Sequence, residues 1–313
     1  MFEIKRYEPS HEQAWNDFVA RSKNGTFLFD RRFMDYHSDR FADSSLMILR
    51  KGRIYALLPA NRVGDTLHSH QGLTYGGLLT DAKATAEGVM EAFGALNAWL
   101  RNEGVRRVTY KAMPWIYHRL PAEEDLYALT QVCHARLLTR EISSTILLQQ
   151  PLRFTESRKS GLRKALREGL YMKESGDLAA FWQMLDDNLA SRHHTHPVHS
   201  LDELRLLQGR FPQQIHLYLI YNKEKEPVGG TWVFDTGQVV HTQYIASTEE
   251  GKAYGALDLL FDELINRRYR EGIYLDFGKS TEEGGRVLNE HLIFQKEGFG
   301  GRGVCYDTYE WEP

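Results

Sequence analysis

The pattern of apolar and polar positions predicts one order of elements that occurs twice along the chain. In the first half, a helical period is followed by strand-like alternation, a long helical period and a further strand. The expected elements are a helix at 10–21, strands at 45–50, 54–61 and 66–79, a helix at 84–103, a strand at 105–111, a helix at 122–136 and a strand at 143–149. Gly104 follows the long helix, where a left-handed residue commonly ends a helix.

The second half repeats this order. Its expected elements are a helix at 177–191, strands at 215–221, 227–235 and 238–247, a helix at 255–271 and a strand at 273–277. Three meandering strands, a right-handed crossover helix and a parallel fourth strand make a mixed sheet with helices on its faces. The sequence therefore predicts an α/β (α+β) protein with two tandem domains, 1–150 and 151–313, each a mixed, mostly antiparallel sheet flanked by helices.

Between the two halves lies a strongly basic segment, 151–168, which we expect to be a helix. Its basic residues are Arg153, Arg158, Lys159, Arg163, Lys164 and Arg167. Two interpretations stay open: a solvated helix face, and a surface for the phosphates of a transfer RNA acceptor stem.

Composition narrows the class of protein. With 313 residues, 42% of them hydrophobic, the chain can bury one large core or two ordinary ones. A net charge of −3 gives no global field to recruit nucleic acid or an anionic membrane. Cys133 and Cys305 form no CxxC pair, which argues against a disulfide framework or structural zinc. The chain shows neither a signal-like apolar run nor a stretch of about 18 apolar residues. We therefore expect a cytoplasmic protein without a membrane span.

The stretch from the strand at 238–247 into the following helix suits acyl transfer to an amine. Such a reaction passes through a tetrahedral oxyanion, which needs fixed hydrogen-bond donors. Amides at a helix start also bind phosphates, so we expect this loop to hold an acyl donor. The expected donor-binding residues are Ser247, Gly251, Lys252 and Gly255. The match to the Gln/Arg-x-x-Gly-x-Gly/Ala pattern of acetyl-CoA enzymes is partial, because Leu257 occupies the last small position. An ordinary glycine-containing helix entry is the alternative.

Several segments together resemble a known family. They are YLDFGKS at 274–280, LIFQKEGFG at 292–300, YIAS at 244–247 and SHQGLTYGGLL at 69–79. They resemble the FemAB-like and BioF2-like branch of the acyl-CoA N-acyltransferase (GNAT) superfamily, which includes peptidoglycan-bridge aminoacyltransferases. The resemblance covers nearly the whole chain and implies two tandem GNAT-like domains with the transfer site in the second. It implies transfer from acyl-CoA or aminoacyl-tRNA to a small-molecule or peptide amine, in bacterial cell-wall or envelope metabolism.

The resemblance also implies roles for single residues. Lys296 stands where the bridge-forming enzymes have a lysine after phenylalanine, and we expect it to be catalytic, with Tyr244 near the leaving group. The remaining residues are expected to bind substrate: Arg192, His196, Tyr75, Asp276, Gly278 and Lys279. Tyr75 is equally explained as a packed core tyrosine. Met113 before Pro114 replaces the cleft aspartate of those enzymes, which leaves the acceptor open.

Four histidines lie close together at positions 193, 194, 196 and 199. Neither a carboxylate nor a cysteine stands at ligand spacing beside them, so we expect no metal. An acceptor-binding loop and an exposed polar loop are the remaining interpretations. The alternative function is a non-catalytic ligand- or partner-binding protein that retains the double fold. The sequence does not determine the oligomeric state.

Overall fold

The computed structural model describes residues 1–193 and 195–313, and the side chains of residues 192 and 193 are not described. The chain forms two compact units. The first contains Met1–Ile142, Thr281–Val287 and Cys305–Pro313, and the second contains Ser143–Ser280 and Leu288–Val304. The predicted domains, 1–150 and 151–313, are continuous stretches. The observed units instead interleave, because segments late in the chain return to the first one.

Two groups of strands build the first unit. One has the order β1 (Phe2–Arg6), β2 (Leu46–Arg50), β3 (Arg53–Leu58) and β6 (Leu79–Thr80), and all neighbours are antiparallel. The other contains β4 (Asn61–Val63), β5 (Thr66–His68), β7 (Arg107–Lys111) and the end of β16 (Arg302–Trp311). β5 is parallel to β7.

The helices of the first unit supply its core. They are α1 (Glu12–Arg21), α2 (Arg31–Met34), α3 (Ala86–Asn102) and α4 (Glu124–Gln131). The apolar side of α3 is buried, with Val89, Phe93, Leu96 and Leu100 at most 1% exposed. This periodic stripe is the one that predicted the helix at 84–103.

The predicted strand at 66–79 is wrong. Residues 66–68 form β5, residues 79–80 form β6, and the loop 69–78 separates them. The backbone of this loop cannot continue a strand, because His70 (φ 66°) and Gly77 (φ 94°) are left-handed. The strand β1 was not predicted.

The second unit is built around one sheet. Its strand order is β9 (Tyr171–Glu174), β10 (Ile215–Tyr221), β11 (Pro227–Asp235), β12 (Val239–Ser247), β13 (Tyr274–Lys279) and the end of β8 (Arg136–Leu147). Neighbours are antiparallel except β12 and β13, which are parallel. The predicted fold class, mixed and mostly antiparallel, is confirmed.

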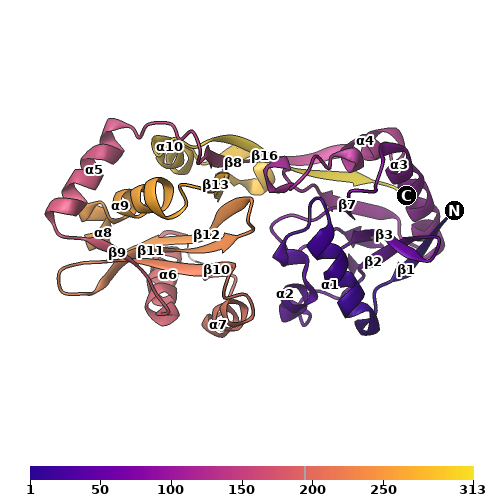
Figure 1. Cartoon of the computed structure of the whole chain (residues 1–313), viewed down its shortest axis with the longest axis horizontal. Coiled ribbons are helices and arrows are strands. Elements are labelled where there is room, and N and C mark those ends of the chain that lie inside the picture. Colours follow the sequence, from indigo (N-terminus) through magenta and orange to yellow (C-terminus); the bar gives the residue numbers. More distant parts are fainter. Residues whose placement is uncertain (194) are drawn as a thin grey trace. The chain divides into compact units, whose positions relative to one another are not determined.

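Helices cover both faces of this sheet. They are α5 (Glu156–Arg167), α6 (Leu178–His193), α7 (Leu201–Arg210), α8 (Glu249–Tyr254), α9 (Ala256–Glu263) and α10 (Glu290–Gly298). Figure 1 shows α9 and α10 above the strands β10–β12, and α6 and α7 below them. Among the helices of the described residues, none is long and apolar enough to cross a membrane.

The predicted helix at 255–271 corresponds to α9 and the π-helical turn that directly follows it. Gly255, with φ 79°, ends α8 in the left-handed region, α9 follows, and Leu264–Arg268 is a π-helix. A Cβ atom at Gly255 would lie 2.4 Å from the backbone oxygen of Gly161 in α5. Glycine therefore permits both the kink and the close approach of α5. Neither β9 nor α7 was predicted.

Candidate active site

The sheet of the second unit parts between β12 and β13. Their parallel register covers three pairs and ends at His241 and Asp276. Beyond that pair, β12 continues along β11 to Ser247, while β13 follows β8 to Lys279. A register shift between Trp232 and Val233 marks a bulge opposite them in β12. Bulges bend a strand, and here the bend follows the last β12–β13 pair.

A pocket of about 410 Å³ lies where the strands part. Leu185 and Leu189 reach it from α6 below the sheet, whereas Leu257 and Phe261 reach it from α9 above. An unbroken sheet would separate these two sets of side chains. The pocket therefore passes through the opening between β12 and β13, and Ser247 at the end of β12 also lines it.

Lys296 brings a cation to this pocket. Its side chain lies on α10, is 4% exposed, and is one of the lining residues. The ammonium donates to the carbonyl oxygens of Gly278, at 2.8 Å, and Lys279, at 2.9 Å. Burial lowers the pKa of Lys296 to about 8, and the charge of Asp276 opposes this effect. The group is thus mainly protonated at pH 7.

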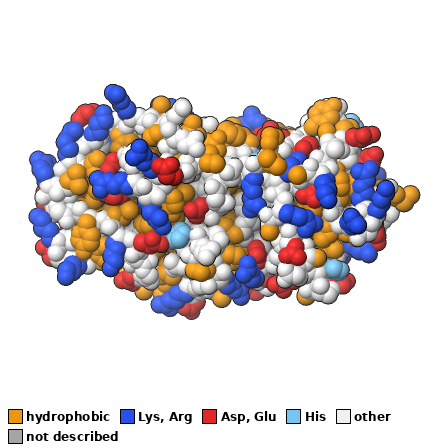
Figure 2. Space-filling view, in the orientation of Figure 1, with side chains coloured by type: hydrophobic (Ala, Val, Ile, Leu, Met, Phe, Trp, Pro, Cys, Tyr) orange, Lys and Arg blue, Asp and Glu red, His pale blue; other side chains and the backbone are white. Residues whose placement is uncertain are grey.

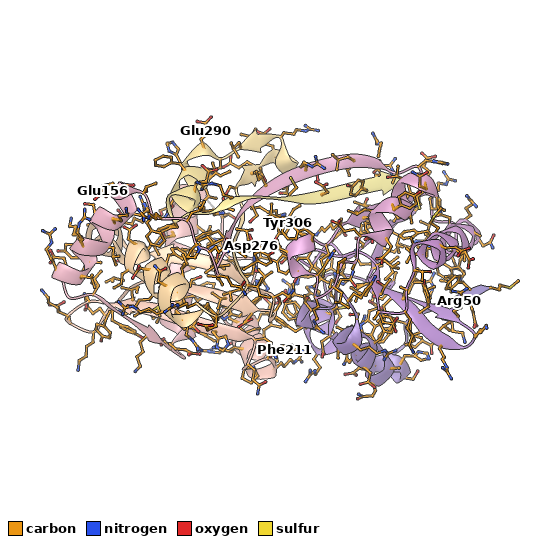
Figure 3. The ribbon with its side chains drawn as sticks, turned by 45° about the horizontal axis from the view of Figure 1, so that its top comes forward. Arg50, Glu156, Phe211, Asp276, Glu290 and Tyr306 are labelled. Carbon is orange, nitrogen blue, oxygen red and sulfur yellow. The ribbon has the colours of Figure 1, made fainter. Side chains whose placement is uncertain are left out.

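Asp276 is fully buried beside the point of parting, inside the second unit in Figure 3, where Glu290 marks the exposed start of α10. Its Oδ1 accepts hydrogen bonds from the Ser143 hydroxyl, from Thr145 Oγ1 at 3.2 Å and from the Gly278 amide at 3.2 Å. Its Oδ2 lies 3.1 Å from His241 Nδ1. These contacts hold the loop whose carbonyls bind Lys296.

The predicted residues Asp276, Gly278, Lys279 and Lys296 therefore come together. Gly278 has φ 74°, which brings its carbonyl to the lysine, and Lys279 contributes through its backbone while its side chain is exposed. His241 was not predicted as a site residue. Its position in a strand parallel to Asp276 was the available signal.

Tyr244 is not among the residues that line the pocket. Its hydroxyl lies 2.6 Å from His199 Nδ1, and its ring stacks on Trp232 at 6.1 Å between centroids. Burial raises the pKa of Tyr244 to about 12, so the phenol stays neutral. The pairing with His199, from the histidine-rich segment, was not predicted.

The two glycines of the expected donor loop have packing roles. A Cβ atom at Gly251 would lie 1.9 Å from the backbone oxygen of Val228 in β11, and Gly255 packs against α5. The first turn of α8 carries Glu249 and Glu250, which disfavour an anion there. Lys252 lines the pocket and is paired with Glu249.

The predicted acceptor residues are spread over the chain. His196 is exposed, and its Nδ1 lies 2.7 Å from Asp186. Arg192 lies in the last turn of α6, but its side chain lies outside the described part of the structure, as does residue 194. Tyr75 belongs to the first unit, is 2% exposed, and donates to Thr26 Oγ1 at 3.1 Å. Within the described residues, no group of three or more His, Cys, Asp or Glu side chains is placed to hold a metal ion.

Comparison with known proteins identifies the fold. Residues 155–284 match the acetyltransferase (GNAT) domain family. Among solved structures, the chain is similar to FemX, with a TM-score of 0.68 and 11% identity over 99% of this chain and 97% of that one.

It is also similar to L-PGS from Bacillus licheniformis (TM-score 0.58, 13% identity, 97% and 92% covered) and to a tandem GNAT protein from the clavulanic acid biosynthesis pathway (TM-score 0.54, 12% identity, 100% and 98% covered). No curated protein matches the sequence. Residues 155–284 thus match the acetyltransferase (GNAT) domain family, and the fold of the whole chain is similar to that of FemX and of a tandem GNAT protein.

Proposed function

We propose that the protein transfers an acyl group from a coenzyme A thioester to an amine, and that the pocket between β12 and β13 is the transfer site. The observation that carries the proposal is the position of one buried cation, Lys296, at the place where the parallel strands part. Membership of residues 155–284 in the GNAT family supports the reaction class.

The reaction needs few groups. The amine nitrogen attacks the thioester carbonyl carbon, a carbon–nitrogen bond forms, and the carbon–sulfur bond breaks. The thiolate leaves and takes up the proton that the amine gives up. Negative charge develops on the carbonyl oxygen between these steps, so donors fixed in a dry site lower the barrier.

Lys296 is suited to this task. An ammonium has three N–H donors, and in the described structure two of them bind the carbonyls of Gly278 and Lys279. We assign the third to the developing oxyanion. The part of β12 beyond His241 faces the opening rather than β13, and its peptide groups can bind an extended donor arm as an added strand does.

The ion pairs of the basic helix α5 support coenzyme A over aminoacyl-tRNA as donor. Three of its five basic side chains are paired within the unit: Arg158 with Asp258 at 3.0 Å, and Lys159 and Arg163 with Glu156 at 4.0 and 2.6 Å. Figure 2 shows Lys and Arg side chains over this part of the surface with acidic ones among them, and Glu156 is labelled in Figure 3. This supports a packed, solvated helix over a continuous phosphate-binding surface.

The acceptor amine is proposed to enter beside the C-terminal end of α6. Leu185, Asn188 and Leu189 of this helix line the pocket, Arg192 lies in its last turn, and the segment with His196 follows it. The pairing of His196 with Asp186 supports this segment as a recognition element for the acceptor. A catalytic role for Tyr244 near the leaving group stays a prediction.

One observation favours a second function, ligand binding without transfer. Gly251 and Gly255 serve packing, and the first turn of α8 is acidic, so the helix start is a poor phosphate site. A protein of this kind would retain the double fold, would have lost affinity for the acyl donor, and would bind another ligand or partner without transfer.

The experiment that tests the proposal combines calorimetric titration of acyl-CoA with an assay of thiol release in the presence of a panel of amines. Leu189→Trp fills the pocket from α6, and Ala190→Trp adds the same ring at the exposed neighbouring position. We expect acyl-CoA binding at least tenfold weaker in Leu189→Trp and unchanged in Ala190→Trp. Wild-type protein that binds no acyl-CoA would refute the site and favour the second function, and binding without thiol release with any amine would refute the transfer step.

A further inference from the structure

The pocket lining has an unusual balance of side chains for an aminoacyl site. Nine of its fourteen lining residues are apolar. The charged ones are Lys252 and Lys296, and the described lining residues contain no Asp or Glu. A ligand that carries an ammonium group would therefore meet two like charges and no pairing carboxylate, which disfavours its binding.

Two of the polar side chains that line the pocket, Asn188 and Ser247, are hydrogen-bonded within the unit. Asn188 Nδ2 donates to the backbone oxygens of Met184, at 2.7 Å, and Ser247, at 3.1 Å. The Ser247 hydroxyl donates to the Val228 carbonyl at 3.1 Å. Asn188 thus ties α6 to β12, and the Ser247 hydroxyl ties β12 to β11, so both side chains contribute less to recognition of a polar acyl group.

The apolar side of the pocket has two layers. Phe261, Phe277 and Phe299 are at most 3% exposed and contact one another, with ring centroids 4.8, 4.9 and 5.9 Å apart. We call these three rings the phenylalanine wall. Leu257 and Leu292 also line the pocket, and they are only half-buried. Half-exposed aliphatic groups inside a concave pocket gain from an apolar ligand that covers them.

We propose that the acyl group of the donor is an uncharged apolar chain longer than acetyl, seated along the phenylalanine wall with its carbonyl at Lys296. This inference rests on the proposed function for its donor class, and it selects a substrate within that class. The volume of about 410 Å³ is within the range of small-ligand pockets and leaves room beyond an acetyl group.

Calorimetric dissociation constants of three thioesters test the inference without knowledge of the acceptor. They are acetyl-CoA, hexanoyl-CoA and δ-aminovaleryl-CoA, the last of which replaces the terminal methyl of hexanoyl by an ammonium of similar size. Each buried methylene adds roughly fourfold in affinity, which corresponds to about 0.8 kcal/mol. We expect hexanoyl-CoA to bind at least tenfold more tightly than either of the others.

Two variants that each introduce one carboxylate test where the acyl chain lies. Leu257→Asp places a carboxylate in the pocket and should shift the preference at least tenfold toward δ-aminovaleryl-CoA. Leu206→Asp introduces the same change at an exposed leucine of α7 and should leave the preference as in the wild type.

Equal or tighter binding of acetyl-CoA or δ-aminovaleryl-CoA would overturn this inference and leave the proposed transferase in place. Loss of thiol release with every donor, despite the expected order of affinities, would instead overturn the transferase and keep the apolar chain as a ligand. A preference that Leu257→Asp does not change would show that the chain lies elsewhere, and this too would overturn the inference.

Discussion

The two units differ in the strand that first runs parallel to a neighbour and then leaves it. In the second unit, β12 is continuous: it runs beside β13 up to His241 and then beside β11 to Ser247. In the first unit, the same course is divided between β5, which is parallel to β7, and β6, which is antiparallel to β3. The loop 69–78 separates the two pieces. One unit thus has an open strand edge where the other has a loop.

Each unit also has a lysine that binds backbone carbonyls at this place. Lys111 Nζ donates to His70, Gln71 and Leu73 at 3.4, 3.0 and 2.9 Å. The amides of Ser69 and Gly76 donate to β7, so the loop closes the edge of that strand. Both units therefore contain a lysine that binds backbone carbonyls. The pocket of the second unit lies where the continuous strand β12 leaves β13.

The largest effect we expect separates the two lysines. Lys296→Met should lower kcat for thiol release by about 100- to 1,000-fold, because one oxyanion donor is lost. Lys111→Met should leave turnover per folded molecule unchanged and lower the free energy of unfolding by about 2 kcal/mol, since it removes charged hydrogen bonds.

Steady-state kinetics and urea unfolding measure both quantities. Lys223→Met, at an exposed lysine of the second unit, is the control for loss of a charge. A loss of kcat in Lys111→Met as large as that in Lys296→Met would contradict the different roles of the two lysines.

The second prediction concerns the glycines of the second unit. Gly251→Ala should destabilise the protein by about 3 kcal/mol, because its Cβ would lie 1.9 Å from a β11 carbonyl that cannot move freely. Gly209→Ala, inside α7 with nothing within 4 Å of its Cβ, should stabilise it by about 1 kcal/mol. Chemical denaturation gives both values, and a neutral Gly251→Ala would contradict the packing role.

The third prediction concerns the pH dependence of the free energy of unfolding, which we expect to reflect a buried histidine in the loop 69–78 of the first unit. His70 is 3% exposed, and its ring stacks on that of His37 with centroids 5.1 Å apart. Burial, with the nearby His37 and Lys111, lowers the pKa of His70 to about 3. Below the ordinary value of 6.5, the unfolded chain takes up a proton that folded His70 does not, so stability falls as the pH falls from 6.5 toward 3.

His70→Asn tolerates the left-handed backbone and does not titrate. Between pH 7 and pH 5, we expect the wild type to lose about 2 kcal/mol more stability than this variant does. His134→Asn, at an exposed histidine with φ 48°, is the matched control. Parallel curves of unfolding free energy against pH for wild type and His70→Asn would disprove the assignment.

The sequence predicted the elements that carry strong periodicity. The second-unit strands at 215–221, 227–235 and 238–247 match β10, β11 and β12 to within a residue, because their apolar runs fill a buried sheet. The strand at 66–79 failed, since its apolar residues Leu73 and Tyr75 are buried from a loop. Hydrophobicity reports burial, and it does not distinguish a strand from a packed loop.

The candidate site was predictable only where residues lie near one another in sequence. The DFG segment at 276–278 indicated the loop that binds Lys296. His241 and Ser143 join Asp276 from 35 and 133 positions away, and only the strand register brings them there. Gly251 and Gly255 belong to a familiar pattern, but their reasons lie in contacts with β11 and α5 that no local sequence encodes.

The interleaved course of the chain has a consequence for synthesis on the ribosome. Residues 308–311 of β16 pair with β7 in the first unit. β7 is therefore made early, and the strand that pairs with it emerges much later. Until then this edge of β7 is unpaired, which exposes the nascent protein to wrong strand pairing.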